Sequence, residues 1–470
     1  MRGETALFDI HDLPGLKVTV MGLGLHGGGA ASAGFFARHG ARVTVTDTKA
    51  EALLASSMEK LAGLGIRYVL GRHEKEDFLS ADLVIKNPAV PADNPFLSLA
   101  GRVETDISVF LSLCASPLLA VTGTKGKSTA ASAMHHVLAR VFPGARLGGN
   151  ITISPLEFLD ELMTADPAPP VVLELSSWQL GDLRGNSVLK PKVSVITNIL
   201  PDHQNRYRGM EDYVDDKKVI YGFQDGSDTT ICNYDDPWGR IFAAGTGGRV
   251  AWFSRSALPL PLDGAWVEAG RGLSRLGTET GVLVPEQVLV PGVHGKLNLL
   301  AAGLACFSYG LSPEVISPAL AQFPGIEHRL ERVGTVGGVP AYNDSAATIP
   351  EATAAAVGSF SGPVTLIMGG TDKKLDFSPL LDVSFAPEHI ILLEGSAGEK
   401  IKDVLGRRGL AFRGPFSRLE DALNEAVSLC SKNGVIVFSP GCASFEMFQN
   451  EFDRGKQFKK HLSAAAGFLP

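Results

Sequence analysis

The stretch Thr122-Gly123-Thr124-Lys125-Gly126-Lys127-Ser128-Thr129 decides how this chain folds. It follows an apolar run, 118–121, that predicts a buried strand, and precedes apolar residues at helical spacing from Ala130 to Val141. A strand, a glycine loop ending in Gly-Lys-Ser and a helix together form a phosphate cradle, because backbone N–H groups and the positive end of the helix meet one anion. The stretch therefore predicts an ATP-binding loop.

Two side chains of this loop have predicted roles toward ATP. Lys127 can reach the β- and γ-phosphates, and the Ser128 hydroxyl can hold Mg²⁺. Val121 stands where the usual loop has a further glycine, so this loop is a shorter variant. The alternative, an ordinary glycine turn before a helix, is disfavoured by Lys and Ser at these positions. We expect ATP to contact Gly123, Thr124, Lys125, Gly126, Lys127, Ser128 and Thr129.

Length and composition limit the class of protein. The chain has 470 residues, 45% of them hydrophobic, which is enough for two to four domains with large cores. A net charge of −7 argues against a nucleic-acid binder. The five cysteines include no Cys-x-x-Cys pair, which fits a reducing cytoplasm. With no signal-peptide pattern and no apolar run of the ~20 residues a membrane span needs, we expect a cytoplasmic protein without membrane insertion.

The N-terminal part has the layout of a nucleotide-binding α/β unit. A strand at 17–21 leads through the glycine-rich turn 22–29 into a helix, and a second strand ends at Asp47. In dinucleotide-binding units such a turn accepts a pyrophosphate and such an acid a ribose hydroxyl. The pattern indicates a nucleotide or nucleotide-sugar without saying which, and a packing turn without a ligand stays open. A further strand at 81–85 runs toward Asn87, where open sheets bind ligands.

The central part places further polar residues after apolar strands. Glu174 lies in the strand predicted at 171–175, where an acid that handles Mg²⁺ belongs, although a lone solvated carboxylate is the alternative. After the strand predicted at 193–197 come Asp202 and His203, at the same end of the sheet as the phosphate loop. We expect His203 to contact a metal or substrate.

The remaining sequence predicts two more regions. Short β-like runs between 229 and 292 read as an accessory sheet, followed by an apolar helix that begins at Gly292. From 325 to 470, three apolar strands each end in a small polar turn, which indicates a parallel sheet with ligands at its carboxyl ends. The predicted fold class is α/β with three domains: a Rossmann-like domain at 1–113, a central P-loop ATPase-like domain at 114–324 and a C-terminal Rossmann-like domain at 325–470.

Several motifs, in order over nearly the whole chain, resemble those of the Mur ligase family. They are Gly22–Leu25, Thr122–Thr129, Gly148–Ile151, Glu174–Leu180, Asp202–Tyr207, His328–Glu331, Asn343–Ser345 and Ser439–Ser444. The chain most resembles the members that add glutamate to UDP-N-acetylmuramoyl-L-alanine in peptidoglycan precursor synthesis. The turn at 22–27 and the Asp-His-x-x-Arg-Tyr stretch favour this step over the later Mur ligases and folylpolyglutamate synthetase, which share the phosphate loop.

The resemblance implies that the first domain holds the UDP part of the sugar substrate rather than NAD. The implied contacts of the UDP-sugar are Gly24, Leu25, His26, Gly27, Asp47, Thr48 and Asn87, with Asn150, Ser176 and His203 from the central domain.

The resemblance also implies ATP with two Mg²⁺ ions. Ser128 and Glu174 would hold one ion and His203 the second. Lys217 matches a family lysine that carries a CO₂-derived carbamate, an oxygen ligand suited to Mg²⁺, and its neighbour Lys218 is the alternative. Asn298, Arg329 and Asp344 would contact the adenine, γ-phosphate and ribose. The implied catalytic residues are Lys127, His203, Lys217 and Arg329.

In the implied reaction, ATP phosphorylates the substrate carboxylate, and the amine of glutamate attacks the acyl phosphate to form an amide. The implied glutamate contacts are Thr348, Lys373, Ser444 and Phe445. Arg329 must reach the ATP, so we expect a domain closure with a hinge near Pro324. We expect a monomer.

The sequence departs from the family pattern at the amino-acid end. Family members usually carry a lysine where this chain has Ala346, and Gly295 replaces an asparagine on the adenine side. Losing a cation from a dicarboxylate site matters, because charged hydrogen bonds contribute ~1.5–3 kcal/mol. Either Lys373 or Lys374 compensates, or the amino acid differs, for example L-glutamate in place of D-glutamate.

Two other classes of protein share parts of this pattern. A nicotinamide-dependent dehydrogenase would explain the glycine turn at 22–27 and Asp47, but not Lys127, Glu174 and His203. A non-catalytic ATP-binding module is disfavoured because Lys127, Glu174 and His203, which catalysis would use, are all present.

Overall fold

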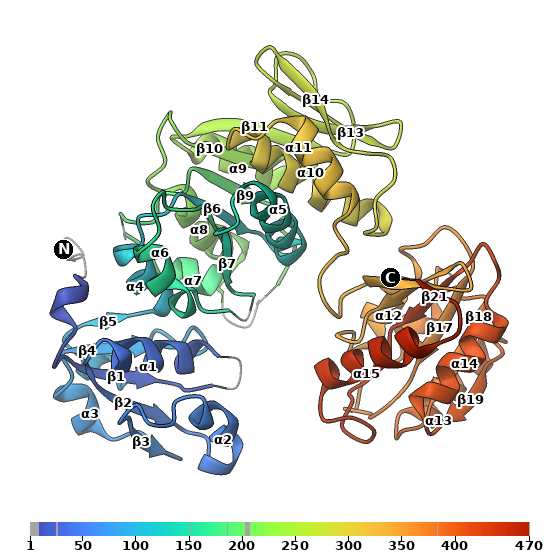
Figure 1. Cartoon of the computed structure of the whole chain (residues 1–470), viewed down its shortest axis with the longest axis horizontal. Coiled ribbons are helices and arrows are strands. Elements are labelled where there is room, and N and C mark those ends of the chain that lie inside the picture. The colour runs from blue at the N-terminus through green and yellow to red at the C-terminus, as the bar shows by residue number, and fades with distance from the viewer. Residues whose placement is uncertain are drawn as a thin grey trace. The chain divides into compact units, whose positions relative to one another are not determined.

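In the part of the chain that the structure describes, the strands form three separate sheets (Figure 1). The computed structural model describes residues 9–24, 27–151, 153–185, 187–202, 207–382 and 384–469. The sheets have five, nine and seven strands, most of them paired in parallel. The α/β fold class with three successive sheets is therefore confirmed. Short 3-10 helices lie at Ile10–Asp12, Leu97–Leu99, Pro155–Glu157, Val219–Tyr221 and Ser378–Leu381.

The N-terminal sheet is parallel throughout, in the order β3-β2-β1-β4-β5. Its strands are β1 (Lys17–Met21), β2 (Arg42–Asp47), β3 (Arg67–Leu70), β4 (Leu83–Lys86) and β5 (Val103–Glu104). Its helices are α1 (Gly28–Arg38), α2 (Glu51–Glu59), α3 (Lys75–Leu79) and α4 (Asp106–Leu113). The strand order reverses between β1 and β4, so their carboxyl ends flank the crevice where such sheets bind ligands.

The central sheet has the order β14-β13-β12-β11-β10-β9-β6-β8-β7. Its strands are β6 (Leu118–Thr122), β7 (Arg146–Gly149), β8 (Val171–Glu174), β9 (Val193–Ile196), β10 (Thr229–Asn233), β11 (Arg249–Ser254), β12 (Gly264–Glu268), β13 (Arg271–Leu276) and β14 (Glu279–Val284). The helices that follow them are α5 (Lys127–Val141), α6 (Leu159–Met163), α7 (Ser177–Asp182), α8 (Met210–Lys218), α9 (Pro237–Gly245), α10 (Gly292–Ser308) and α11 (Pro313–Ala321).

The accessory sheet predicted at 229–292 is wrong, because β10 to β14 extend the central sheet. β10 pairs in parallel with β9, and the ladder continues through β11 and β12 before it turns antiparallel at β13 and β14. From the sequence, the short runs separated by glycines are interpreted as an independent sheet. A local sequence pattern does not reveal which other strand each run pairs with.

The C-terminal sheet has the order β19-β18-β17-β20-β16-β15-β21. Its strands are β15 (Glu331–Val336), β16 (Val339–Asn343), β17 (Val364–Met368), β18 (His389–Leu393), β19 (Arg413–Phe416), β20 (Val435–Phe438) and β21 (Phe468–Leu469). Its helices are α12 (Pro350–Val357), α13 (Gly398–Arg407), α14 (Leu419–Leu429) and α15 (Glu451–Ala464). The three predicted apolar strands are parallel neighbours, while β15 and the edge strand β21 extend the sheet with antiparallel pairing.

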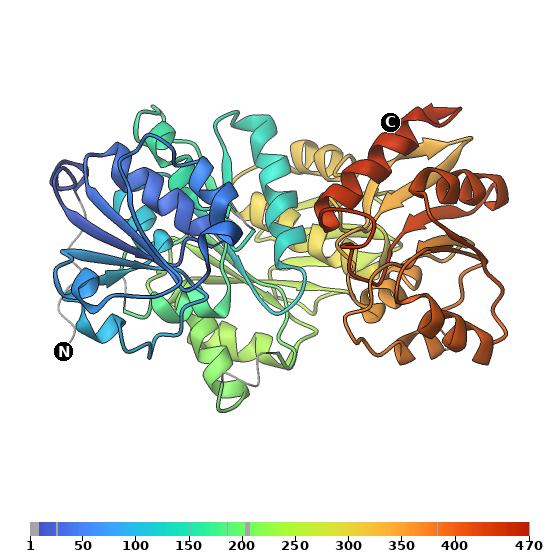
Figure 2. The ribbon, with the colours of Figure 1, turned by 90° about the horizontal axis from the view of Figure 1, so that it is seen from below.

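Alternate residues of these C-terminal strands enter two hydrophobic cores, one on each face of the sheet. Leu366 and Met368 pack with residues of α13, whereas Ile367 and Phe438 pack with residues of α14 and α15. Helices accordingly lie on both faces of this sheet (Figure 2). This layering leaves the carboxyl ends of β17 and β20 open for a site.

The chain divides into two compact units, 1–286 with 297–320, and 287–296 with 321–470. The N-terminal and central sheets both belong to the first unit, and the C-terminal sheet forms the second. The limits predicted at 113 and 324 stay predictions. Within the described ranges, no helix combines the length and apolar character needed to cross a membrane.

Candidate active site

A pocket of about 410 Å³ in the first unit gathers predicted residues that are far apart in the sequence. It lies between residues of the N-terminal sheet and the phosphate loop of the central one. The predicted residues among its lining are Asn87, Gly123, Thr124, Lys127, Asn150, Ser176, Asp202 and Lys217. Predicted contacts for ATP, for the UDP-sugar and for a metal therefore share one pocket.

The phosphate loop is closely packed against its surroundings. Gly123 has φ 143°, and a Cβ there would lie 1.9 Å from Thr197 Oγ1. Gly126 has φ 84°, and a Cβ there would lie 2.2 Å from Asn298 Oδ1. Only glycine fits these two places. The Asn298 side chain, predicted to contact the adenine, thus lies against the loop, and Lys127 Nζ donates to the Thr124 carbonyl at 2.9 Å.

Glu174 stands at the carboxyl end of β8 with its side chain 1% exposed. Its Oε1 accepts a hydrogen bond from Asn150 Nδ2 at 3.0 Å, and its Oε2 is buried with no hydrogen-bond partner among the described residues. A buried carboxylate oxygen without a donor is costly unless a cation meets it. The environment of Glu174 therefore fits the predicted Mg²⁺ ligand and disfavours a solvated carboxylate.

Lys217, on α8, is 1% exposed and points into the same pocket. Its Nζ donates to the Gly123 carbonyl at 2.9 Å and lies 4.5 Å from the centre of the Tyr213 ring. Burial, followed by the charge of Lys127, lowers the pKa of Lys217 to about 7. Lys218 instead pairs with Asp215 at 2.8 Å in a partly exposed position. Of the two lysines, Lys217 is the one in the pocket.

The N-terminal turn meets Asn87 across the crevice between β1 and β4. Asn87 N donates to the Met21 carbonyl at 3.1 Å, and a Cβ on Gly22 would lie 3.0 Å from Asn87 Cβ. Gly24 N donates to Asp47 Oδ2 at 3.2 Å, so the predicted acid also supports the turn. Gly27 is the N-cap of α1, and Thr48 is exposed after β2. Leu25, His26 and His203 lie outside the described residues.

Residues for which the sequence predicted no role also line the pocket. Asp106 begins α4 and accepts a hydrogen bond from Ser154 Oγ at 2.8 Å, with both side chains buried. Gln179 forms a capping box with Ser176 at the start of α7. The Ser-x-x-Gln spacing in the sequence is typical of such a cap, whereas no local sequence pattern indicates that Asp106 lies in the pocket.

In the second unit, Arg329 is held in a tightly constrained loop. The residues on either side, His328 and Leu330, have φ values of 64° and 44°, which are unfavourable for side chains of their size. Asp344 Oδ1 accepts from Leu330 N at 3.1 Å, and Asp344 Oδ2 accepts from Ser439 Oγ at 2.6 Å. Burial raises the pKa of Asp344 to about 7. The loop that carries Arg329 is thus hydrogen-bonded to Asp344, another predicted ATP contact. The side chain of Arg329 is exposed.

The predicted amino-acid contacts gather where β17 and β20 end. Thr371 N donates to the Ala443 carbonyl at 3.0 Å, which joins the two loops. Lys373 Nζ lies 4.9 Å from the centre of the Phe445 ring, and the buried Ser444 Oγ has no hydrogen-bond partner among the described residues. Thr348 is half-buried on a neighbouring loop. This loop lies next to the end of β20 because Gly441 N donates to the carbonyl of residue 347.

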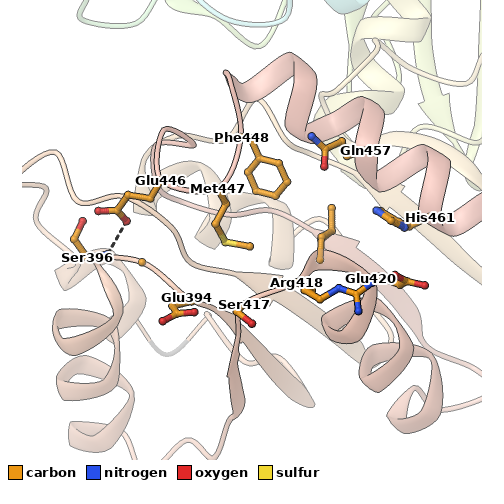
Figure 3. A pocket seen from close by; sticks show the side chains of 12 residues that line it. Glu394, Ser396, Ser417, Arg418, Glu420, Glu446, Met447, Phe448, Gln457 and His461 are labelled. Atoms are coloured by element: carbon orange, nitrogen blue, oxygen red, sulfur yellow. Dashed lines mark hydrogen bonds and ion pairs between the residues drawn. The ribbon is translucent and has the colours of Figure 1, made fainter.

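A separate cavity of about 840 Å³ opens in the second unit, beyond the carboxyl ends of β18 and β19 (Figure 3). Glu394, Glu420 and Glu446 are among its lining residues, together with Arg418, which pairs with Glu420. Three carboxylates against one paired cation make this cavity a poor place for a dicarboxylate amino acid. The Lys373–Phe445 site is the better candidate.

Two known family models match this chain. The family described as the Mur ligase middle domain matches residues 121–306, and the N-terminal domain of MurD-like Mur ligases matches residues 16–109. The chain belongs to the Mur ligase family.

Full-length relatives narrow the likeness within the family. The UDP-N-acetylmuramoylalanine–D-glutamate ligase of Treponema pallidum is 41% identical, covering 96% of this chain and 98% of its own length. The ligase of the same name from Roseiflexus is 39% identical over 95% of this chain and 98% of its own. Among solved structures, the UDP-N-acetylmuramate–alanine ligase MurC of Thermotoga maritima superposes with a TM-score of 0.58 at 20% identity, over 96% of this chain and 99% of that one, which supports the fold.

Proposed function

We propose that this chain joins D-glutamate to UDP-N-acetylmuramoyl-L-alanine through a new amide bond, with ATP converted to ADP and phosphate. The observation that carries the proposal is the 41% identity to a D-glutamate ligase over 96% of the chain. The pocket supports it, because Asn87 and Lys127 line one space. A nucleotide-sugar and a phosphoryl donor can therefore meet there.

The mechanism follows from the side chains around that space. The carboxylate of the alanyl group attacks the γ-phosphorus of ATP, the bond to the bridging oxygen breaks, and an acyl phosphate and ADP result. Lys127 and the N–H groups of the phosphate loop take up charge that develops on the phosphoryl oxygens. The amine of glutamate then attacks the acyl carbon, loses a proton, and phosphate leaves with the bonding electrons.

Magnesium is part of this proposal. Ser128 and Glu174 would hold one ion, and Glu174 Oε2, which lacks a hydrogen-bond partner within the described ranges, supports that assignment. The ion would supply positive charge to the transferring phosphoryl group. His203, which lies outside the described residues, would serve a second ion.

The carbamate on Lys217 is a proposal that its surroundings support. A neutral amine attacks CO₂, an N–C bond forms, one C–O π bond breaks, and a proton leaves the nitrogen. With its pKa lowered to about 7, the Lys217 amine is substantially neutral near neutral pH. The resulting anion would replace a buried cation near Lys127 with an oxygen ligand for Mg²⁺.

Glutamate would bind at the Lys373–Phe445 site of the second unit. Lys373 supplies a cation for a side-chain carboxylate, and the Ser444 hydroxyl, which has no partner in the part of the chain that the structure describes, supplies a donor. Lys373 would thereby stand in for the lysine that Ala346 replaces. Arg329, held exposed beside Asp344, would reach the γ-phosphate after a closure near Pro324.

The decisive experiment measures phosphate release from ATP with UDP-N-acetylmuramoyl-L-alanine, offering D-glutamate and L-glutamate in parallel. We expect release with D-glutamate only. Release with L-glutamate alone would move the proposal to the alternative amino acid, and no release with either would overturn it. NADH binding without ATP turnover would revive the dehydrogenase, which nothing in the pocket favours.

We further propose that the protein acts as a monomer in the cytoplasm. Light scattering at working concentrations tests the first point, with a dimer mass as the contrary result. Cell fractionation tests the second, with recovery in the membrane fraction as the contrary result.

A further inference from the structure

A buried ion pair joins the N-terminal sheet to the central one behind the pocket. Lys86 Nζ lies 2.7 Å from Asp182 Oδ2, and the two side chains are 4% and 10% exposed. Both residues belong to the first compact unit. Burying two charges carries a large desolvation penalty, so such a pair is weak evidence for stability and calls for another explanation.

Each partner of this pair sits next to residues that line the pocket. Lys86 ends β4 and directly precedes Asn87, and its Nζ also donates to the Val90 carbonyl at 3.0 Å. Val90 N in turn donates to the Asn87 carbonyl at 2.9 Å. The lysine therefore holds both ends of the 87–90 turn, which presents Asn87 to the pocket.

The other residue of the ion pair, Asp182, belongs to the helix that forms the opposite wall of the pocket. Asp182 ends α7, the short helix whose first turn supplies Ser176, Ser177, Trp178 and Gln179 to the pocket lining. A six-residue helix has little stability of its own, so its direction depends on contacts such as this pair. Moving Asp182 would turn the capped end of α7 relative to Asn87.

A second buried link between the same parts runs parallel to the first. Asp106, at the start of α4, accepts from Ser154 Oγ at 2.8 Å and from Ile107 N at 2.9 Å. Its carboxylate is close enough to Asp182 to feel that charge, and burial raises the pKa of Asp106. Asp106 itself lines the pocket, so the buried groups around the Lys86–Asp182 pair reach its wall.

We propose that Lys86 and Asp182 are positioning residues that fix the Asn87 turn against α7 and so set the width of the pocket for the UDP-sugar. The inference rests on the proposed function, because it names the substrate whose binding the pair controls. It predicts a selective effect. Binding of the UDP-sugar would span both walls, whereas the phosphate loop is built on β6 and α5, which carry neither residue of the pair.

The test compares variants of the full-length enzyme by steady-state kinetics and by calorimetry with the UDP-sugar alone. For Lys86→Met we expect the KM and the Kd of UDP-N-acetylmuramoyl-L-alanine to rise about tenfold or more, with the KM of ATP within about twofold of wild type. Asp182→Asn should raise the same constants by a smaller factor, because the amide can still accept from Lys86.

Two further variants separate positioning from stability. Lys192→Met removes another lysine that pairs with a buried carboxylate, Asp228, at 3.0 Å in the same unit, and should leave the UDP-sugar constants unchanged. The double variant Lys86→Met with Asp182→Leu replaces the pair by apolar groups, so it should restore the melting temperature. We expect it to keep the raised Kd, since an apolar contact does not hold the Val90 carbonyl.

The outcomes are distinguishable. Unchanged UDP-sugar constants in Lys86→Met, an equal rise for ATP, or a wild-type Kd in the double variant would each overturn the positioning role. Should Lys86→Met not fold, Asp182→Asn and the double variant decide by the same criteria. A wild type that binds the UDP-sugar but does not turn over overturns the proposed function alone, and one that fails to bind overturns both.

Discussion

The phosphate-loop pocket and the amino-acid site at the end of β17 differ in how firmly their side chains are held. Glu174 and Lys217 are each 1% exposed and are tied to Asn150 and Gly123 by hydrogen bonds. In the second unit, Lys373 and Phe445 are exposed and contact each other. Transfer of a phosphoryl group requires fixed charges, whereas an amino acid can be recognised by side chains that settle on binding.

The two sites also differ in how well they tolerate a change of sequence. A substitution in the pocket breaks several buried contacts, whereas Ala346 can replace a lysine because the loops around it carry their own backbone hydrogen bonds. Ala346 N donates to the His328 carbonyl at 2.9 Å whatever its side chain. We therefore expect substitutions in the pocket to have the largest effects and substitutions at the amino-acid site the smallest.

Removing the lysine of the phosphate loop should have the largest effect. For Lys127→Ala we expect phosphate release to fall about 10²–10³-fold or more, because a preorganised positive group at the phosphoryl oxygens is lost. The measurement is the single-turnover rate at saturating ATP. Lys402→Ala is the matched control, since Lys402 pairs with Glu399 on the exposed face of α13, and an equal loss there would contradict the assignment.

The carbamate assignment at Lys217 is tested by chemical rescue. We expect Lys217→Ala to lose about 10²-fold in rate and to regain part of it with acetate or formate, which can supply the missing oxygen ligand. Lys218→Ala, which removes only the pair with Asp215, should retain activity. Failure of rescue, together with no added mass of CO₂ on wild-type Lys217, would overturn the assignment.

The pH dependence of carbamylation has a definite sign. The pKa of Lys217 is lowered to about 7, so below that pH the amine is protonated and cannot attack CO₂. At fixed dissolved CO₂, the rate at which CO₂ reactivates decarbamylated enzyme should fall about tenfold per pH unit below 7 and level off above it. A reactivation rate that keeps rising toward pH 10 would mean that the buried lysine titrates like an exposed one.

The sequence predicted the two Rossmann-like sheets, the phosphate loop and the grouping of Lys127, Asn150 and Lys217, because local motifs and family spacing encode them. It failed where the answer depended on pairing between distant segments. The strands after residue 229 joined the central sheet, although their pattern gives no partner. Asp106 and the Lys86–Asp182 pair were missed because a charge in an apolar segment shows its partner only after folding.

At the amino-acid site we expect a smaller effect. Lys373→Ala should raise the KM of D-glutamate about tenfold while leaving the KM of ATP and of the UDP-sugar unchanged, since one charged hydrogen bond contributes ~1.5–3 kcal/mol. Lys374→Ala is the neighbouring control. Lys374 has φ 62°, a backbone conformation that is unfavourable for alanine as well as for lysine. The substitution therefore removes the charge and leaves the backbone strain of the turn in place. An equal rise in the KM of D-glutamate in both variants would show that glutamate binding does not depend on Lys373 in particular.

The smallest effect is expected from restoring the family lysine. Ala346→Lys adds a cation beside the loop of Arg329, but the carboxylate that it would meet already has Lys373. We therefore expect the KM of D-glutamate to fall only a few-fold in the wild-type background, and to fall by about tenfold in Lys373→Ala. Non-additivity of this size, measured as a double-mutant cycle on KM, is the signature of two lysines serving one carboxylate. Strict additivity would mean that they meet different groups, and that Lys373 does not compensate for Ala346.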